Sequence, residues 1–402
     1  MTTIEEYIQS LGFRARLGAG ELAKLKTEEK NAILEALAKA LEENAEIIYA
    51  ANKRDVEKAK AAGLKASLID RLTLTEARFK SMVAGVRHVA TLPDPVGEKL
   101  WQRKRDSGIT INKVRVPLGV VAVVFESRPN VFIDTAALCL KTGNAVILRG
   151  GKEAFETNSA LAKATAQGLG KYANAVIFVD RLEHEGVTAL VRATGLVDVA
   201  IPRGGERLIR AMCEAALVPV LKHYKGVCHI YVDDEADMAM ALTILDNAKT
   251  QRPGVCNAAE CLLINERLSP MFLPMVKAWA EDKGVKLNFE DNDWGAEFLA
   301  LEMNVGIVKD YRAAIEHINQ FGSHHSDCIV TMNETRAAEF LRDVDSAAVY
   351  HNVSTRFTDG AEFGMGAEIG ISTDKLHARG PMGLEELTTY KYQITGDGVI
   401  RS

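Results

Sequence analysis

The stretch "RPGVCNAAE" (252–260) holds a cysteine, Cys256, in a setting where a thiol could act as a nucleophile. A Pro-Gly pair precedes it, which indicates a turn, and Gly254 leaves room for a ligand to approach the backbone. Asn257 and nearby N–H groups could face a developing oxyanion. A reactive thiolate needs such an open, polar place. Cys261 lies in an apolar run, which is typical of a small core residue.

The composition indicates a soluble globular protein that keeps its thiols reduced. The 402 residues include only six cysteines, without a CxxC pair, so a disulfide scaffold is excluded. A net charge of −5 argues against nucleic acid or an anionic membrane as the main partner. The N-terminus is acidic where a signal peptide is basic, and no apolar run approaches the length of a membrane span. We therefore expect a cytoplasmic protein.

Apolar strands alternate with helical segments twice along the chain, which predicts two doubly wound α/β domains with parallel sheets. One long helix is expected over residues 20–62, before the first series begins. The expected strands of the first series are 119–127, 144–150, 175–180, 197–205 and 218–223. Those of the second series are 228–234, 261–266, 305–310, 328–333 and 347–352.

Two segments fit neither series and predict a β-ribbon. Residues 101–119 alternate polar and apolar side chains around Asp106-Ser107-Gly108, and residues 387–400 also read as extended. An exposed ribbon is not stable alone, so we expect it to be an oligomerisation flap. The expected parts are 1–100 and 117–226 for cofactor binding, 227–355 for catalysis, 356–386 returning to the cofactor-domain side, and 101–116 with 387–402 as the ribbon.

A nucleotide-type α/β domain joined to a second domain with a loop cysteine suits thiol-assisted hydride transfer. In such chemistry the thiolate attacks an acyl carbon and a nicotinamide exchanges hydride with the thio-bound carbon. The alternative of another class is a cysteine acyltransferase or hydrolase, with His223 or His229 as the base of Cys256. That alternative leaves the first domain without a role. A non-enzymatic nucleotide-binding scaffold is a third hypothesis.

The chain resembles the aldehyde dehydrogenase superfamily and, within it, the family of γ-glutamyl phosphate reductases. The resemblance covers essentially the whole chain, and a long C-terminal run over 354–392 is its most specific part. The other motifs are "FESRPNV" (125–131), "KTGNAVILRGGKEA" (141–154), "IPRGGERLI" (201–209), "QRPGVCNAAE" (251–260) and "AIEHINQFGSHHSD" (314–327).

The resemblance implies a fold of aldehyde dehydrogenase type and the reduction of L-glutamate 5-phosphate by NADPH to L-glutamate 5-semialdehyde and phosphate, the second step from glutamate towards proline. Cys256 matches the family nucleophile, which forms a γ-glutamyl thioester. Hydrolytic relatives carry a glutamate base where this chain has His223, and losing that base protects a thioester from water. His223 itself is given no catalytic role. No metal is implied. Another acyl-phosphate or aldehyde dehydrogenase, acting on a different acid, is the nearest alternative.

The implied cofactor contacts lie in three segments. Arg149 stands where many relatives have lysine, and its fork suits the 2′-phosphate of NADP. "PRGGERL" (202–208) brings a glycine turn and a helix N-terminus against the cofactor's phosphates. Glu297 matches the acid that holds the nicotinamide-side ribose. The cofactor residues expected from the resemblance are Arg149, Gly150, Arg203, Gly204, Gly205 and Glu297.

The substrate contacts are expected around "HNVSTRF" (351–357), which follows the last strand at the carboxyl edge where α/β sites form. Ser354 and Thr355 are expected to bind the carboxylate. Arg128 and Arg379 are expected to bind carboxylate or phosphate, and Asn130 to polarise the thioester oxygen as a catalytic residue.

Histidines gather in "EHINQFGSHHSD" at spacings of seven and eight residues, without a clear carboxylate ligand. We therefore expect a structural role for His317, His324 and His325. The expected partners are the small substrate and further copies of the chain. Functional coupling with glutamate 5-kinase is a hypothesis that the sequence leaves open.

Overall fold

The computed structural model describes residues 2–290 and 292–401, which divide into two compact units. Of these residues, unit 1 comprises 2–222, 365–370 and 382–401, and unit 2 comprises 223–290, 292–364 and 371–381. The C-terminal segment thus alternates between the units, whereas we expected all of 356–386 on the side of the first domain. None of the described helices combines the length and hydrophobicity that a membrane crossing requires.

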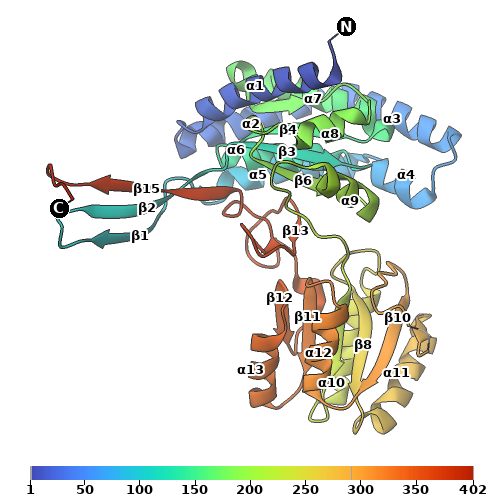
Figure 1. Ribbon diagram of the computed structural model, residues 1–402. Helices are drawn as coiled ribbons and strands as arrows, with labels where there is room; N and C mark the ends of the chain where they lie inside the picture. The colour runs from blue at the N-terminus through green and yellow to red at the C-terminus, as the bar shows by residue number, and fades with distance from the viewer. Residues whose placement is uncertain (1, 291, 402) are drawn as a thin grey trace. The chain divides into compact units, whose positions relative to one another are not determined.

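The sheet of unit 1 has four parallel strands in the order β5-β4-β3-β6 (Figure 1). Every residue of β3 and β4 is buried, because helices cover both faces, so these strands read as continuous apolar runs. Alternate residues of β3 pack with α1, α8 and α9 on one face. Right-handed crossovers place α6 and α7 on the other face, with α2, α3 and α5 packed against them.

The elements of unit 1 begin with a run of five helices, and the strands follow. The helices are α1 (Ile4–Leu22), α2 (Thr27–Glu43), α3 (Ala45–Ala61), α4 (Ala66–Leu72), α5 (Glu76–Thr91), α6 (Asn130–Lys141), α7 (Phe155–Leu169), α8 (Glu185–Val191) and α9 (Glu206–Ala215), with short 3₁₀ turns η1 (Lys152–Ala154) and η2 (Gly170–Ala175). The sheet strands are β3 (Val120–Phe125), β4 (Ala145–Gly150), β5 (Val176–Phe178) and β6 (Val199–Arg203).

Unit 2 contains a six-stranded parallel sheet in the order β12-β11-β7-β8-β10-β9. Successive residues of a strand face opposite layers: Ile230 packs with α10 and α11, whereas Tyr231 packs with α12 and α13. The strands are β7 (Cys228–Val232), β8 (Ala259–Asn265), β9 (Lys286–Asn288), β10 (Glu302–Val308), β11 (Ser326–Val330) and β12 (Ala348–His351), with a small pair β13 (Ile371–Ser372) and β14 (Gly380–Pro381). The helices are α10 (Met238–Thr250), α11 (Ser269–Lys283), α12 (Tyr311–Phe321), α13 (Glu334–Asp343) and the 3₁₀ turn η3 (Thr355–Phe357).

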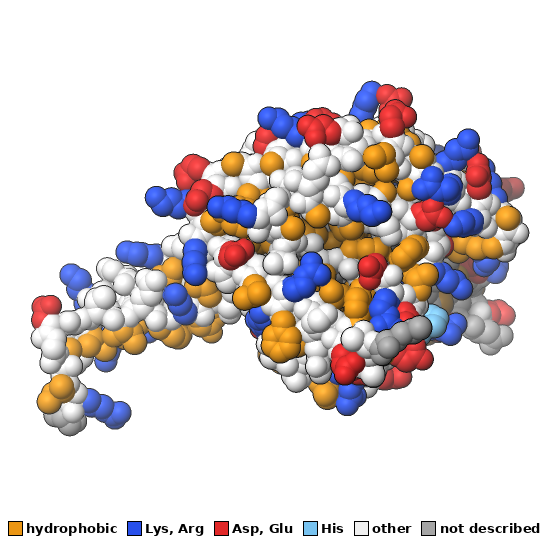
Figure 2. All heavy atoms as spheres, turned by 90° about the horizontal axis from the view of Figure 1, so that it is seen from above, with side chains coloured by type: hydrophobic (Ala, Val, Ile, Leu, Met, Phe, Trp, Pro, Cys, Tyr) orange, Lys and Arg blue, Asp and Glu red, His pale blue; other side chains and the backbone are white. Residues whose placement is uncertain are grey.

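A three-stranded antiparallel ribbon extends from unit 1 in the order β1-β2-β15. Its strands are β1 (Lys99–Lys104), β2 (Thr110–Pro117) and β15 (Thr388–Thr395). Tyr390, Tyr392 and Ile394 alternate along β15 and are 48%, 52% and 60% exposed. Figure 2 shows hydrophobic side chains gathered along one side of this ribbon. The ribbon therefore presents an apolar face that unit 1 does not cover.

The prediction of an α/β fold with parallel sheets is confirmed, but two expected elements differ. The single helix expected over 20–62 is the end of α1 followed by two helices, α2 and α3, which meet at Asn44. Asn44 has φ −102° and ψ 12°, and its side-chain amide donates to the Ala40 carbonyl (2.8 Å), so it ends one helix and starts the next. Residues 218–223 form only an isolated bridge, Ala200 with Val220, because Pro219 lacks an N–H donor.

Candidate active site

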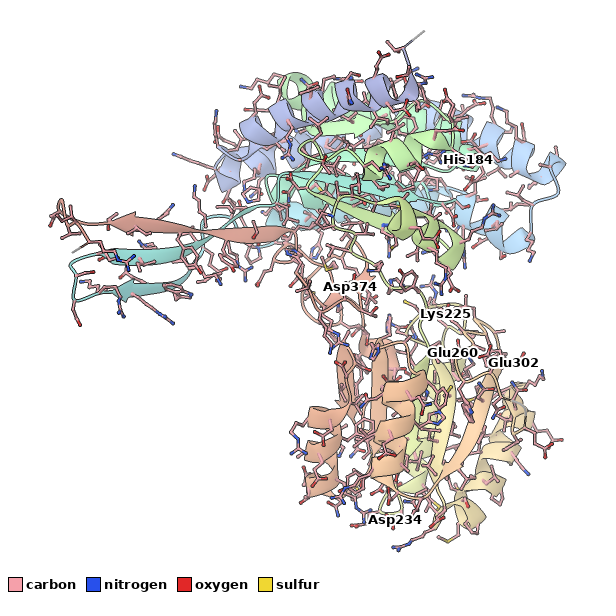
Figure 3. The ribbon with its side chains drawn as sticks, in the orientation of Figure 1. His184, Lys225, Asp234, Glu260, Glu302 and Asp374 are labelled. Carbon is pink, nitrogen blue, oxygen red and sulfur yellow. The ribbon has the colours of Figure 1, made fainter. Side chains whose placement is uncertain are left out.

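The cysteine loop of unit 2 lies at the amino edge of its parallel sheet. Cys256 follows α10 and precedes β8, and His325 stands directly before β11. Gly226 likewise precedes β7. Because parallel strands begin at the same edge of a sheet, these three residues meet there. Figure 3 shows Lys225 and Glu260 at this end of unit 2 and Asp234 at the opposite end.

We expected the segment after β12 to lie at the carboxyl edge, and this expectation was wrong. After β12 the chain turns back along the sheet until Thr358 reaches Ser326, the first residue of β11, with 2.5 Å between the two hydroxyl oxygens. The Tyr350 hydroxyl lies 2.7 Å from the same Thr358 oxygen. These hydroxyl contacts bring the 354–358 segment to the amino edge, where the cysteine loop is.

Asn257 joins the cysteine loop to the 354–358 segment. Its side-chain amide donates to the carbonyls of Thr358 (2.9 Å) and Arg356 (3.3 Å). Its own backbone carbonyl accepts a hydrogen bond from the Thr355 hydroxyl (2.7 Å). The amide N–H groups that we expected to face an oxyanion are therefore committed to the backbone, and Asn257 instead fixes where the residue before it, Cys256, is placed.

Gly226 packs directly against the backbone of Cys256. A Cβ atom built on Gly226 would lie 2.5 Å from the Cα atom of Cys256, and closer still to its carbonyl group. The Cys228 thiol donates to that same carbonyl oxygen (3.2 Å). The cysteine loop thus packs against a backbone position that only glycine can occupy.

Two imidazoles approach the Cys256 sulfur. The sulfur, one nitrogen of His223 and one nitrogen of His325 all lie within 4.8 Å of one another. His223 Nδ1 is 2.9 Å from the carbonyl oxygen of Ile371, which can only accept, so Nδ1 carries a proton. Burial, helped by the nearby His223, lowers the pKa of His325 to about 3, so this ring is neutral at physiological pH.

The Arg356 guanidinium interacts electrostatically with Cys256 and with the neighbouring Arg252 and Asp359. The pKa of Arg356 is lowered first by burial and then by repulsion from Arg252, and Cys256 is among the groups that interact with it electrostatically. Arg356 Nε donates to the side chain of Gln251 (2.8 Å), which fixes its direction. Neighbouring cations that repel each other are stabilised by a bound anion, so this corner of unit 2 suits an anionic group.

Acidic groups lie beside the cysteine loop. Glu297, expected to hold a ribose, accepts a hydrogen bond from the backbone N–H of Gly226 (2.8 Å), next to the cysteine loop. Glu260 forms a fully buried ion pair with Lys249 (2.8 Å). Burial raises the pKa of Glu260 to about 7, while the attraction of Lys249 opposes that rise. This buried ion pair joins α10 to β8, the two elements that flank the cysteine loop.

The expected substrate residues of unit 2 are mostly occupied by the protein itself. Ser354 caps η3 by accepting from the Arg356 N–H (3.3 Å), and the Thr355 side chain is completely buried. Arg379 donates to the carboxylate (2.7 Å) and the carbonyl (2.9 Å) of Asp345. The structure therefore brings Ser354 and Thr355 to the cysteine loop as supporting residues and holds Arg379 in an ion pair.

In unit 1, the expected cofactor residues Arg149 and Gly150 are the last two residues of β4, at the carboxyl edge of the sheet. Arg149 is only 8% exposed, and it donates to the carbonyls of Gly150 (2.9 Å) and Leu182 (3.2 Å). Its Nε is buried without a partner in the described residues, and burial lowers the pKa of the guanidinium. A Cβ at Gly150 would collide with the Asn158 side-chain amide, so only glycine fits at this position.

The turn after β6 brings the second set of expected cofactor residues to the same edge. The Gly205 N–H, at the start of α9, donates to the Glu126 carboxylate (2.9 Å). A Cβ at Gly204 would lie 2.6 Å from that carboxylate, and Arg203 packs against the backbone of Gly370. We expected the Gly205 N–H to face a phosphate of the cofactor, but it donates to Glu126 instead. A phosphate could accept from this N–H only after displacing the Glu126 carboxylate.

The loop after β3 carries Arg128 and Asn130. The Asn130 amide donates to Asp134 (2.9 Å), one turn along α6, rather than facing an open space. Burial raises the pKa of Asp134 to about 6, whereas Asn130 and Arg203 oppose the rise. Ser127 has a positive φ of 46° and donates to the Glu153 carboxylate through its N–H (2.8 Å) and its hydroxyl (2.7 Å). The positive φ of Ser127 and its two hydrogen bonds to Glu153 fix the turn between β3 and α6.

Arg356, Arg252 and His325 are the residues that sequence reasoning missed. Arg356 stands beside Ser354 and Thr355 in the motif that we singled out, and its charge was the available signal. His325 lies in the histidine-rich motif, but its partners are distant in sequence. His317, from the same motif, packs instead against Trp294 (4.6 Å between ring centroids) and takes no part in this cluster.

Comparison with known proteins places the chain in a family. A family model described as the aldehyde dehydrogenase family matches residues 5–298. The γ-glutamyl phosphate reductase of Moorella thermoacetica is 51% identical, over 98% of each chain, and that of Desulforamulus reducens is 49% identical, over 98% of this chain and 99% of the relative. The crystal structure of γ-glutamyl phosphate reductase from Thermotoga maritima is 40% identical with a TM-score of 0.97, covering 98% of this chain and all of that chain. The chain therefore belongs to the aldehyde dehydrogenase family and, within it, to the family of γ-glutamyl phosphate reductases.

Proposed function

We propose that this chain reduces L-glutamate 5-phosphate to L-glutamate 5-semialdehyde and phosphate with NADPH, the second step from glutamate towards proline. The names of the relatives that are 49–51% identical support the substrate and the reaction. The observation that supports it most in the structure is the Cys256 thiol, held on Gly226 and accompanied by two imidazoles and the Arg356 guanidinium.

In the first half of the reaction, the Cys256 thiolate attacks the γ-carbonyl carbon. A sulfur–carbon bond forms as the carbon–oxygen bond to phosphate breaks, which leaves a γ-glutamyl thioester on Cys256 and inorganic phosphate. We assign the thiol proton to His223, because a nitrogen of this ring lies within 4.8 Å of the sulfur, whereas His325 has a pKa of about 3 and binds a proton poorly. One water molecule can bridge the gap of up to 4.8 Å.

The phosphate group is bound by Arg356, with Arg252 beside it. The negative phosphate attracts both guanidinium groups and so offsets the repulsion between them. The same attraction stabilises the leaving phosphate as negative charge develops on it. Arg128 remains a proposed contact for the substrate's carboxylate. Ser354 and Thr355 act mainly by positioning, because their hydroxyl groups are already bonded within unit 2. Arg379 pairs with Asp345 but keeps a buried Nε without a partner among the described residues, so it remains a proposed contact for carboxylate or phosphate.

The residues of unit 1 fit NADPH in part. Arg149 keeps a buried Nε without a partner among the described residues, whereas the side-chain positions of Gly150 and Gly204 are filled by Asn158 and Glu126. We assign the cofactor to Arg149, Gly150, Arg203, Gly204 and Gly205, with Glu297 of unit 2 for a ribose. When bound, NADPH supplies the hydride that reduces the acyl carbon. The protein's part is to hold that carbon on Cys256.

The experiment runs the reaction backwards, with NADP⁺, glutamate semialdehyde and phosphate, and follows NADPH absorbance. We expect Cys256→Ser to abolish turnover while NADPH still binds, measured by fluorescence. Cys213→Ser is the matched control, because this half-buried thiol of α9 belongs to unit 1 and should keep full activity. Acyl transfer or hydrolysis without nicotinamide would favour the cysteine transferase or hydrolase alternative. Full activity of Cys256→Ser would overturn the proposal.

The ribbon is proposed to join copies of the chain, because the exposed Tyr390, Tyr392 and Ile394 need a cover. Sedimentation of Tyr392→Glu against the wild type tests this: we expect smaller assemblies, and unchanged assemblies would contradict it. A cytoplasmic location and coupling with glutamate 5-kinase remain proposals from the sequence.

A further inference from the structure

Cys256, His223 and His325 form a donor set that the reaction described above does not need as a set. Their ligand atoms lie within 4.8 Å of one another. One thiolate and two imidazoles are donors that Zn²⁺ prefers over Mg²⁺ or Ca²⁺. We propose that this cluster is a reversible Zn²⁺ site, in which the metal binds the catalytic thiolate and inhibits the enzyme.

The geometry needs only a small adjustment. Zn–S bonds of about 2.3 Å and Zn–N bonds of about 2.0–2.1 Å place tetrahedral ligand atoms roughly 3.4–3.7 Å apart. The present limit of 4.8 Å exceeds this by about 1 Å, which side-chain rotation about Cys256 and His223 can supply, because both residues are only half-buried. A fourth position remains for water, as in exchangeable metal sites.

The surroundings of both histidines suit metal binding. The Ile371 carbonyl holds the proton of His223 on Nδ1, the arrangement by which outer partners orient a metal-binding imidazole. His325 is fully buried, its Nδ1 lies 2.8 Å from the Ser326 hydroxyl, and its Nε2 has no partner among the described residues. A buried polar atom without a partner costs free energy, and a metal that the ring could bind would remove part of that cost.

Binding is balanced by the release of a proton. A protonated Cys256 thiol loses H⁺ to solvent as the Zn–S bond forms, and both rings bind through lone pairs, so no oxidant or reductant is required. The thiolate is then unavailable to attack the acyl phosphate. The inhibitory consequence rests on the proposed function, whereas the metal site itself does not.

The test uses the full-length protein, reduced and metal-free, without substrate. Titration with Co²⁺ should give one bound metal per chain and a near-ultraviolet thiolate-to-cobalt absorption band, which Zn²⁺ removes by competition and Mg²⁺ does not. Cys256→Ser should abolish the band. His223→Gln and His325→Gln should each weaken binding by about tenfold or more. Cys213→Ser and His184→Gln, an exposed histidine of unit 1 shown in Figure 3, are the matched controls and should bind as the wild type does.

A missing band, or one that survives Cys256→Ser, would overturn the metal site. Undiminished metal binding in both histidine variants would also overturn the metal site. If the His325→Gln variant does not fold, because His325 is fully buried, the His223→Gln variant alone still tests the histidine ligands. Activity distinguishes the two proposals. If Co²⁺ and Zn²⁺ bind but turnover continues, the thiol is not the nucleophile and the proposed function fails. If turnover is normal and no metal binds, only the metal site fails.

Discussion

Replacing Gly226 by alanine should displace the nucleophile without touching its chemistry. The new Cβ would lie 2.5 Å from the Cα atom of Cys256, whereas nonbonded carbon atoms prefer about 3.5–4.0 Å. It would lie nearer still to the Cys256 carbonyl oxygen, at 1.8 Å, so the two backbones must separate by about 1.5 Å to restore ordinary contact. Since Asn257 and Thr355 tie the loop on its other side, the shift falls on the cysteine itself.

A misplacement of about 1 Å at a reacting group can cost about 10²-fold in rate, which corresponds to about 2.7 kcal/mol of activation free energy. We expect Gly226→Ala to lower kcat by about that factor. The NADPH assay gives kcat, and the rate of alkylation by iodoacetamide reports separately on the thiol. Any loss of cofactor affinity should be confined to the proposed Glu297 ribose contact, because Glu297 accepts a hydrogen bond from the Gly226 N–H.

Gly254→Ala is the matched control in the same loop. A Cβ at Gly254 meets nothing nearer than the Leu299 carbonyl oxygen, at 3.9 Å, so this variant should keep kcat within about twofold. Equal activity of Gly226→Ala and Gly254→Ala would refute the reasoning, because it would mean that the loop tolerates a shift of its backbone. Equal loss in both would point to a general weakening of the loop instead.

Three further predictions concern charges. Arg149→Ala should weaken NADPH binding by about tenfold or more and NADH binding far less; equal losses, measured by fluorescence titration, would remove the 2′-phosphate role. Burial raises the pKa of Asp134 to about 6, above its ordinary 3.8, so the contribution of this group to stability is present below pH 4 and is lost as the pH rises through 6. At pH 8 the free energy of unfolding of Asp134→Asn should therefore exceed that of the wild type by up to about 3 kcal/mol, and this difference should vanish near pH 4. A difference that stays constant between pH 4 and pH 8 would contradict the assignment. Lys249→Met leaves Glu260 as an unpaired buried carboxylate and should cost about 3–5 kcal/mol in urea denaturation; the double variant with Glu260→Leu should regain most of that loss, and no regain would show that the pair is not the cause.

The strands could be predicted because burial on both faces makes them continuous apolar runs. β3 and β8 are such strands, and both were expected within a few residues. Helix boundaries were harder, since the apolar periodicity of α2 and α3 continues past Asn44 without a proline or glycine. Residues 218–223 have the hydrophobicity of a strand, but Pro219 limits the hydrogen bonds that a strand needs.

The part of the candidate site that lies within one short motif could be predicted from the sequence. The Pro-Gly turn placed Cys256 in a loop, and its half-exposed position agrees with that expectation. The meeting of His223, His325 and Cys256 was not predictable, because it depends on which parallel strands are neighbours and on the edge at which their loops gather. Hydrogen bonding decided the rest: Asn257 and Thr355 bind each other's segments, which residue type alone could not indicate.

The pairing of β2 with β15 has a consequence for the protein as it is being made. Pro117 pairs with Thr388, so the inner strand of the ribbon emerges from the ribosome long before its partner is synthesised. At about 5–20 residues per second, that delay is roughly 15–55 seconds. During this time the nascent chain carries an unpaired strand edge, the kind of surface that chaperones recognise and that neighbouring nascent chains on a polysome can pair with.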